Sequence, residues 1–309
     1  MFKVGFAGAG NVGATAALYV AESNLADVAL VDIADGLAAG KALDLAAAAP
    51  VRGFSGRVTG GTEWPLLEGS DVVVVTAGLA RKPGMSRDDL LAKNAAIVRS
   101  IAEQVAAHAP DAVVIMVTNP LDAMCEAFRQ ASGFPAARVA GMAGVLDSAR
   151  FSAFLALELG ASPREVSAMV LGGHGDTMVP LVSSATVGGV PVAELLPAGK
   201  IKAVVKRTAG AGAEVVALLK TGSAFVSPGA SAAEMALAVL RDEKRVVPAA
   251  ARLSGEYGYD GVYLGVPVVL GRGGVERVIE MKLSKDEKAA LDKSAEAVKG
   301  LFEAMKRLG

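Results

Sequence analysis

The feature that most restricts the fold is a glycine pattern placed between a predicted strand and a predicted helix. Residues 4–7 are apolar and predict a short strand, and residues 11–22 have the periodicity of a helix. The turn between them reads Gly8-Ala9-Gly10-Asn11-Val12-Gly13. In such a unit the first glycine allows a tight turn, the second lets the backbone approach a pyrophosphate, and the third lets helix and strand pack closely. Free N–H groups at the helix start then bind the phosphates.

An acidic residue follows the second predicted strand, residues 28–31. Asp32 lies 19 residues after Gly13, where a carboxylate can accept hydrogen bonds from the hydroxyls of an adenosine ribose. The same carboxylate would repel the 2′-phosphate of NADP. The glycine pattern and Asp32 together predict an NAD site, and a glycine-rich turn followed by a solvated aspartate is the alternative.

Short apolar strands alternate with helices through the first half of the chain. Residues 72–75 are four valines bounded by small and polar residues, which is typical of a strand buried on both faces. This alternation implies βαβ units and a mainly parallel sheet. The other elements predicted here are a strand at 112–117 and helices at 37–48 and 88–108.

The pattern changes near residue 145. We therefore expect an α/β protein in which a Rossmann-type doubly wound parallel sheet (residues 1–145) binds NAD. An α+β catalytic and substrate-binding domain (residues 146–309) is expected to follow it. In this second part the predicted helices are 146–159, 201–219, 231–240 and 285–308, and the predicted strands are 166–170, 245–247, 261–264 and 267–270, with a hairpin at 187–191.

Composition and charge exclude several classes of protein. Lys and Arg number 31 against 32 Asp and Glu, so the net charge of −1 gives no reason to expect nucleic acid or an anionic membrane as partner. No stretch approaches the ~18 uninterrupted apolar residues of a spanning helix. Cys125 is the one cysteine, and its helical surroundings predict a packed core thiol. The first residues run directly into a strand, so we expect a cytoplasmic protein.

Three further segments place polar residues where predicted elements begin or end. Thr118-Asn119-Pro120 follows the strand at 112–117, and open α/β sheets bind ligands at such strand ends. Residues 146–150 read Leu-Asp-Ser-Ala-Arg, and residues 172–176 read Gly-Gly-His-Gly-Asp. The chain has two histidines. His174 lies in a loop position suited to a reacting group, whereas His108 ends a predicted helix, where a capping or solvated role is expected.

Together with residues 80–87, these segments resemble the lactate and malate dehydrogenase family. The motifs occur in the order GAGNVG, TAGLARKPGMSR, TNPLD, GVLDSAR and GGHGDTMVP, and the resemblance spans nearly the whole chain. It implies that His174 carries the proton, since a pKa of ~6.5 allows both protonation states near neutrality. It also implies that Asp147 holds the other imidazole nitrogen and favours the imidazolium.

The resemblance implies the remaining site residues as well. Arg150 would bind the C1 carboxylate of the substrate with two hydrogen bonds, and Arg87 would polarise the C2 oxygen. Asn119 would donate to the substrate oxygen beside the nicotinamide, and Asn94 and Val117 would touch the cofactor. Taken alone, Asp147 and Arg150 could be an ordinary helix ion pair, and Arg87 a solvated loop charge.

Arg81 is the position at which the family separates its substrates. Malate enzymes resembling this chain carry arginine there, and lactate enzymes carry an uncharged amide. Malate and oxaloacetate have a second carboxylate, whose burial without a cation costs several kcal/mol, whereas a guanidinium provides a bidentate partner. The resemblance therefore implies reversible, NAD-dependent oxidation of malate to oxaloacetate, with no metal ion.

Three alternatives use the same scaffold. A lactate or branched 2-hydroxy-acid dehydrogenase is disfavoured by Arg81. An NAD-using glycosidase would need a metal bound by Cys and His, and neither Cys125 nor His108 lies in a ligand cluster. A regulatory NAD(H)-responsive protein would have lost a residue such as His174, which is present. Family members are usually dimers or tetramers, so we expect a homodimer or homotetramer.

Overall fold

A nine-stranded sheet forms the centre of the described part of the protein. The computed structural model describes residues 1–79 and 86–308, and within them the strands follow the order β14-β13-β12-β6-β5-β4-β1-β2-β3. Strands β1 to β6 pair in parallel, while β12, β13 and β14 add an antiparallel extension. The strands are β1 (Phe2–Ala7), β2 (Ala26–Val31), β3 (Val58–Gly61), β4 (Val72–Val75), β5 (Val113–Met116), β6 (Val139–Gly141), β12 (Arg245–Ser254), β13 (Asp260–Gly271) and β14 (Gly274–Val278).

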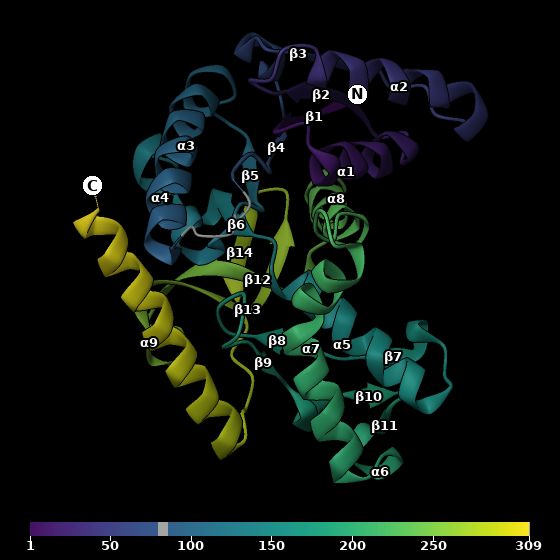
Figure 1. Cartoon of the computed structure of the whole chain (residues 1–309), viewed down its shortest axis with the longest axis vertical. Helices are drawn as coiled ribbons and strands as arrows, with labels where there is room; N and C mark the ends of the chain where they lie inside the picture. The colour runs from purple at the N-terminus through teal and green to yellow at the C-terminus, as the bar shows by residue number, and fades with distance from the viewer. Residues whose placement is uncertain (80–85, 309) are drawn as a thin grey trace.

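Helices cover both faces of the parallel part. Figure 1 shows α3 and α4 on one side of these strands and α1 with α8 on the other. Helix α8 comes from the second half of the chain and packs along α1, so the two halves are interlocked. The helices are α1 (Asn11–Glu22), α2 (Leu37–Arg52), α3 (Arg87–His108), α4 (Leu121–Ser132), α5 (Gly144–Leu159), α6 (Val192–Leu195), α7 (Ala198–Leu219), α8 (Val226–Leu240) and α9 (Lys285–Arg307).

The valine strand β4 lies inside the sheet, next to its central strand β5. All four of its side chains are buried, and it pairs with β1 on one side and β5 on the other. Because helices cover both faces, an uninterrupted apolar run is required here, and the predicted buried strand is confirmed. The carboxyl ends of β1, β4 and β5 meet at one edge, where ligands bind in open α/β sheets.

One predicted strand, residues 166–170, is wrong as a continuous element. The structure divides it into β7 (Val166–Ser167) and β8 (Val170–Leu171), which belong to different sheets. The N–H of Val170 donates to the hydroxyl of Ser148 at 2.8 Å, so the ladder of β7 does not continue. Strand β8 instead pairs with β9 (Val179–Pro180). The hairpin expected at 187–191 is confirmed by β10 (Thr186–Val187) and β11 (Val190–Pro191), which are antiparallel and joined by two glycines with positive φ.

The strands predicted near the C-terminus are too short. The segments at 261–264 and 267–270 form one continuous strand, β13, and β12 runs to Ser254 instead of ending at residue 247. Pro267 lies inside this continuous strand although proline cannot donate to a ladder. In the structure it lies opposite Pro248, which also lacks an N–H group, so this pair of facing residues needs no N–H donor. In the first half of the chain, the structure also contains helix α4 and strands β3 and β6.

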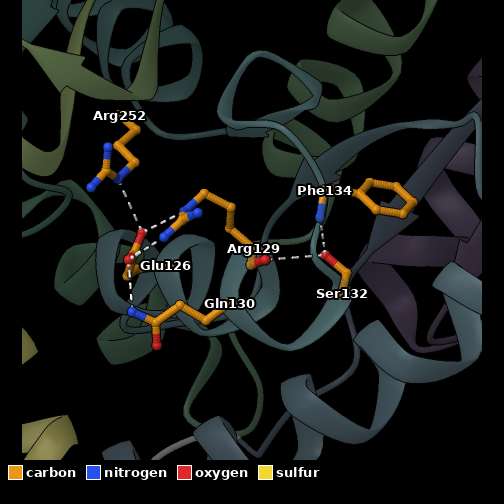
Figure 2. A network of polar contacts seen from close by, with 6 residues as sticks. All are labelled: Glu126, Arg129, Gln130, Ser132, Phe134 and Arg252. Carbon is orange, nitrogen blue, oxygen red and sulfur yellow. Dashed lines mark hydrogen bonds and ion pairs between the residues drawn. The ribbon is translucent and has the colours of Figure 1, made fainter.

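A buried carboxylate joins the two halves of the chain beside the sheet. Glu126 on α4 accepts two hydrogen bonds from Arg129, at 2.8 and 2.9 Å, and one from Gln130 at 2.8 Å. Figure 2 shows the same carboxylate facing Arg252, which reaches it from β12 at 3.6 Å. Together with the pairing of β12 and β6, this cluster anchors the antiparallel strands to the parallel part. None of the helices in the described segments is both long and apolar enough to cross a membrane.

We expect Glu126→Ala to lower the free energy of unfolding by about 2 to 3 kcal/mol, because it leaves two guanidinium groups without their shared carboxylate. The loss stays below that of a fully buried pair because Arg129 and Arg252 keep 26% and 30% of their side chains exposed, so water screens them. Urea unfolding followed by circular dichroism measures it. The control Glu296→Ala removes an acid that is 71% exposed beside Lys299 and should change little. Equal effects of the two variants would contradict this role.

Candidate active site

The glycine loop after β1 has the shape that its sequence predicts. Gly8 has φ +115°, and a Cβ there would lie 2.5 Å from the backbone nitrogen of Ala77. A Cβ on Gly13 would lie 2.1 Å from the carbonyl oxygen of Gly8, so α1 packs directly on the turn. In contrast, apart from Gly10 and its chain neighbours, no described atom lies within 4 Å of a Cβ placed on Gly10. Neighbouring atoms therefore occupy the space beside Gly8 and Gly13, whereas the space beside Gly10 is open. This shape fits a pyrophosphate bound against the first N–H groups of α1.

Asp32 stands at the carboxyl end of β2 and holds this loop. Its Oδ2 accepts a hydrogen bond from the N–H of Ala9 at 2.7 Å, and its Oδ1 accepts one from Ala34 at 3.0 Å. The carboxylate also borders the cavity described next. The sequence led us to expect a ribose contact for Asp32. In addition, its hydrogen bond to Ala9 connects the glycine loop to the end of β2.

Two neighbouring cavities lie along the carboxyl edge of the parallel strands. The first has a volume of about 560 Å³ and the second about 440 Å³, and they share Thr76, Gly78 and Leu79. The first is lined mostly by apolar residues and contains Asp32, whereas the second contains His174. A dinucleotide with an apolar adenine end and a reacting end fits this arrangement. Residues lining the first cavity that the sequence analysis missed include Trp64, Ala96, Ile97, Ser100 and Ile101.

His174 and Asp147 form the polar centre of the second cavity. His174 lies in the loop between β8 and β9, and its Nδ1 is 2.8 Å from Oδ2 of Asp147. Asp147 is buried near the start of α5, and Nη1 of Arg150 donates to its Oδ1 at 3.3 Å. The spacing of three residues puts Asp147 and Arg150 on one helix face. Because a carboxylate accepts from Nδ1–H, Nε2 is the ring nitrogen left to exchange a proton.

The charges around His174 favour its protonated form. Burial alone lowers the pKa of the imidazole, but the charge and hydrogen bond of Asp147 and the charge of Asp122 raise it more. Arg150 acts in the opposite direction. The net result is a pKa above the ordinary value of 6.5.

Asp122 belongs to the site although the sequence analysis gave it no role. It is buried in the first turn of α4, and its Oδ2 accepts a hydrogen bond from the N–H of His174 at 3.1 Å. Burial raises its pKa to about 6, against the lowering effect of that N–H group. The sequence signal was an acidic residue flanked by apolar Leu121 and Ala123, directly after Asn119-Pro120.

Of the site residues predicted in the first half of the chain, some line a cavity and one lies behind it. Val117 and Asn119 line the second cavity, next to Arg150 and His174. Asn94 lines neither cavity and is fully buried. Its burial is tolerated because its side-chain amide is hydrogen-bonded. Its amide donates to the carbonyl oxygens of Asn119 at 2.6 Å and of Leu79 at 3.1 Å, and its Oδ1 accepts from the N–H of Leu79 at 2.8 Å. Asn94 thus joins two segments that line the cavities.

The remaining residues singled out from the sequence are Arg81, Arg87, His108 and Cys125. Arg81 and the side chain of Arg87 lie outside the described part of the structure. Nδ1 of His108 is 3.3 Å from a carboxylate oxygen of Glu68, away from both cavities. Cys125 is a buried core thiol, as predicted, and burial raises its pKa. Within residues 1–79 and 86–308, no cluster of three or more His, Cys, Asp or Glu residues could hold a metal ion.

Comparison with known sequences covers both halves of the chain. Residues 2–141 match the family model for the lactate/malate dehydrogenase NAD-binding domain, and residues 144–307 match the one for the lactate/malate dehydrogenase alpha/beta C-terminal domain. A malate dehydrogenase of Thermomicrobium roseum is 58% identical over 306 residues, or 99% of each chain. A malate dehydrogenase of Roseobacter denitrificans is 54% identical over 98% of this chain and 97% of that one.

Solved structures agree with the sequence comparison. A malate dehydrogenase of Salinibacter ruber superposes with a TM-score of 0.96 at 52% identity, over 99% of this chain and 98% of that one. A lactate dehydrogenase of Cryptosporidium parvum, complexed with lactic acid and nicotinamide adenine dinucleotide, has the same TM-score at 42% identity and the same coverage. The resemblance found in the motifs is thus confirmed over the full length, and the chain belongs to the lactate/malate dehydrogenase family.

Proposed function

We propose that this chain catalyses the reversible, NAD-dependent oxidation of (S)-malate to oxaloacetate. The observation that carries the proposal is the pairing of His174 with buried Asp147 in a cavity that also contains Arg150. This cavity adjoins the one bordered by the glycine loop and Asp32. The malate dehydrogenases of Thermomicrobium roseum and Salinibacter ruber, at 58% and 52% identity, support malate as the substrate.

His174 acts as the proton carrier in this mechanism. When bound, NAD accepts the hydride that leaves C2 of malate. Nε2 of His174 takes the proton from the C2 hydroxyl, and in the reverse direction it returns that proton. Asp147 holds Nδ1, which fixes the tautomer and stabilises the imidazolium. The buried position of Asp147 strengthens this interaction, since little water screens it.

Three other side chains orient the substrate in the proposal. Arg150 uses N–H groups beyond the one donated to Asp147 to bind the C1 carboxylate. Asn119, which lines the same cavity, donates to the C2 oxygen. Arg87 stabilises charge on that oxygen as it develops.

We further propose that the two halves of the chain have different functions. Residues 1–145 bind NAD through the glycine loop, Asp32 and Val117, and residues 146–309 provide the proton carrier and the carboxylate clamp. Exposed apolar side chains on α2, such as Leu43 and Val51, support assembly into a homodimer or homotetramer. A cytoplasmic location is part of the same proposal.

Arg81 is the proposed counterion of the C4 carboxylate, so Arg81→Gln should shift preference from oxaloacetate toward pyruvate. An unpaired carboxylate or guanidinium costs ~3 to 4 kcal/mol at such a site, which predicts a change in the ratio of kcat/KM on the order of 10²- to 10³-fold. Initial rates of NADH oxidation with oxaloacetate, pyruvate and a branched 2-keto acid measure it, with Lys82→Gln as the control. An unchanged ratio would remove Arg81 from substrate selection, and an unaltered chain inactive on all three acids would refute the proposed function.

His174→Asn should reduce turnover by about 10³-fold, because no other group is proposed to exchange the hydroxyl proton. Binding of NADH should persist, since His174 is absent from the cavity that contains Asp32. Stopped-flow kinetics and NADH fluorescence separate the two quantities. His108→Asn is the matched control and should keep normal rates, because His108 contacts Glu68 away from both cavities. Near-normal turnover of His174→Asn would exclude this residue from the chemistry.

The pKa of His174 predicts opposite pH dependences for the two directions. Reduction of oxaloacetate consumes the proton on His174, so its kcat/KM should fall as pH rises through a midpoint above 6.5, and malate oxidation should rise over the same range. Asp147→Asn should move this midpoint down, because the carboxylate charge and hydrogen bond raise the pKa. Profiles of kcat/KM against pH test both statements. A midpoint that stays fixed or moves up in Asp147→Asn would contradict the assignment.

A further inference from the structure

A serine of the C-terminal helix is buried against the loop that carries His174, here called the His174 loop (residues 172–178). Ser294 lies in the middle of α9 and is fully buried. Its Oγ accepts a hydrogen bond from the N–H of Gly173 at 2.8 Å and donates to Oγ1 of Thr177 at 3.1 Å. The hydroxyl therefore contacts the loop on both sides of His174. A buried hydroxyl without such partners is costly, so both contacts favour this one loop position.

The loop backbone lies so close to α9 that glycine is required. Gly172 has φ +87°, and a Cβ there would lie 2.7 Å from Oγ of Ser294. A Cβ on Gly173 would lie 2.7 Å from a methyl group of Val298, which is one helical turn beyond Ser294. The loop thus has no room to move toward α9, and the hydroxyl of Ser294 prevents it from moving away.

Strand β13 and helix α4 hold the same loop as well. The N–H of Gly172 donates to the carbonyl oxygen of Gly265 on β13 at 2.8 Å, and the return bond is 3.1 Å. The next two N–H groups are bound by side chains, Gly173 by Ser294 of α9 and His174 by Asp122 of α4. Three consecutive amides are therefore fixed. The direction in which the chain presents the imidazole to Asp147 depends on all three.

We propose that Ser294 is a positioning residue for proton transfer: it sets the placement of the His174 loop and thereby the contact between His174 and Asp147. It lines neither cavity, so it acts through the loop and not on substrate or cofactor. For its kinetic consequence this inference rests on the proposed function. Its structural consequence, a changed environment of the His174 ring, does not.

The structural consequence can be measured in the unliganded protein by NMR. With two histidines in the chain, ring-labelled protein gives one signal set for His174 and one for His108 as an internal reference. Ser294→Ala should move the midpoint of the His174 titration down by at least about half a pH unit, because a displaced imidazole interacts less with Asp147. The titration of His108 should not change.

The kinetic consequence separates positioning from binding. In Ser294→Ala, kcat for oxaloacetate reduction should fall about tenfold or more, since small misplacement of a reacting group is enough for such a loss. The KM for oxaloacetate and the Kd for NADH should change less than about threefold, since no substrate or cofactor contact is removed. Thr177→Val removes the loop partner of the same hydroxyl and should act in the same direction, which keeps the test valid if Ser294→Ala folds poorly.

A matched control weakens α9 without touching the loop. Ser284 caps the start of α9 by accepting a hydrogen bond from Glu287, so Ser284→Ala should reduce stability while the His174 titration and kcat remain normal. Normal titration and kcat in both Ser294→Ala and Thr177→Val would overturn the inference, as would equal effects of Ser284→Ala. If the unaltered chain shows no turnover, the proposed function is rejected but the positioning role of Ser294 is not. The NMR titration then still decides that role.

Discussion

The hydrogen bond between His174 and Asp147 is the interaction around which the rest of the structure is arranged. A carboxylate in the protein interior is costly unless charged and polar partners surround it, and here the partners are the imidazole and Arg150. The pair is useful only at the end of a cofactor cavity. The fold must therefore bring a helix start, a hairpin loop and the edge of a parallel sheet to one place.

The parallel sheet provides that edge through its topology. Because β1, β4 and β5 pair in parallel, their carboxyl ends lie at the same edge, so segments far apart in sequence line two adjoining cavities. The second half of the chain then contributes twice. Its helix α8 packs against α1 beside the glycine loop, and its strands β12 to β14 continue the sheet itself. The distance between the glycine loop and His174 is consequently fixed by shared packing.

The sequence predicts those parts of the fold and site whose signals are local. Four consecutive valines specify a buried strand, and glycines at fixed spacing specify the turn at Gly8, because both depend on neighbours in the chain. The roles of Asp122 and Ser294 could not be found in this way, since each meets the His174 loop only through tertiary packing, across 52 and 121 residues of sequence. The break between β7 and β8 has the same origin, because it depends on the hydroxyl of Ser148.

A common principle connects the residues that the sequence did not reveal. Loops at strand ends expose N–H and C=O groups that no ladder satisfies, and each such group near the site must find a partner. Asp32 takes this role for Ala9 and Asn94 for Leu79, while Asp122 and Ser294 take it for the His174 loop. A buried polar side chain satisfies the backbone and also fixes its direction, which a purely apolar contact does not. Several buried polar residues of the described core, among them Asn94, Asp122 and Ser294, therefore lie next to the site, because backbone without a ladder must be held in one position there.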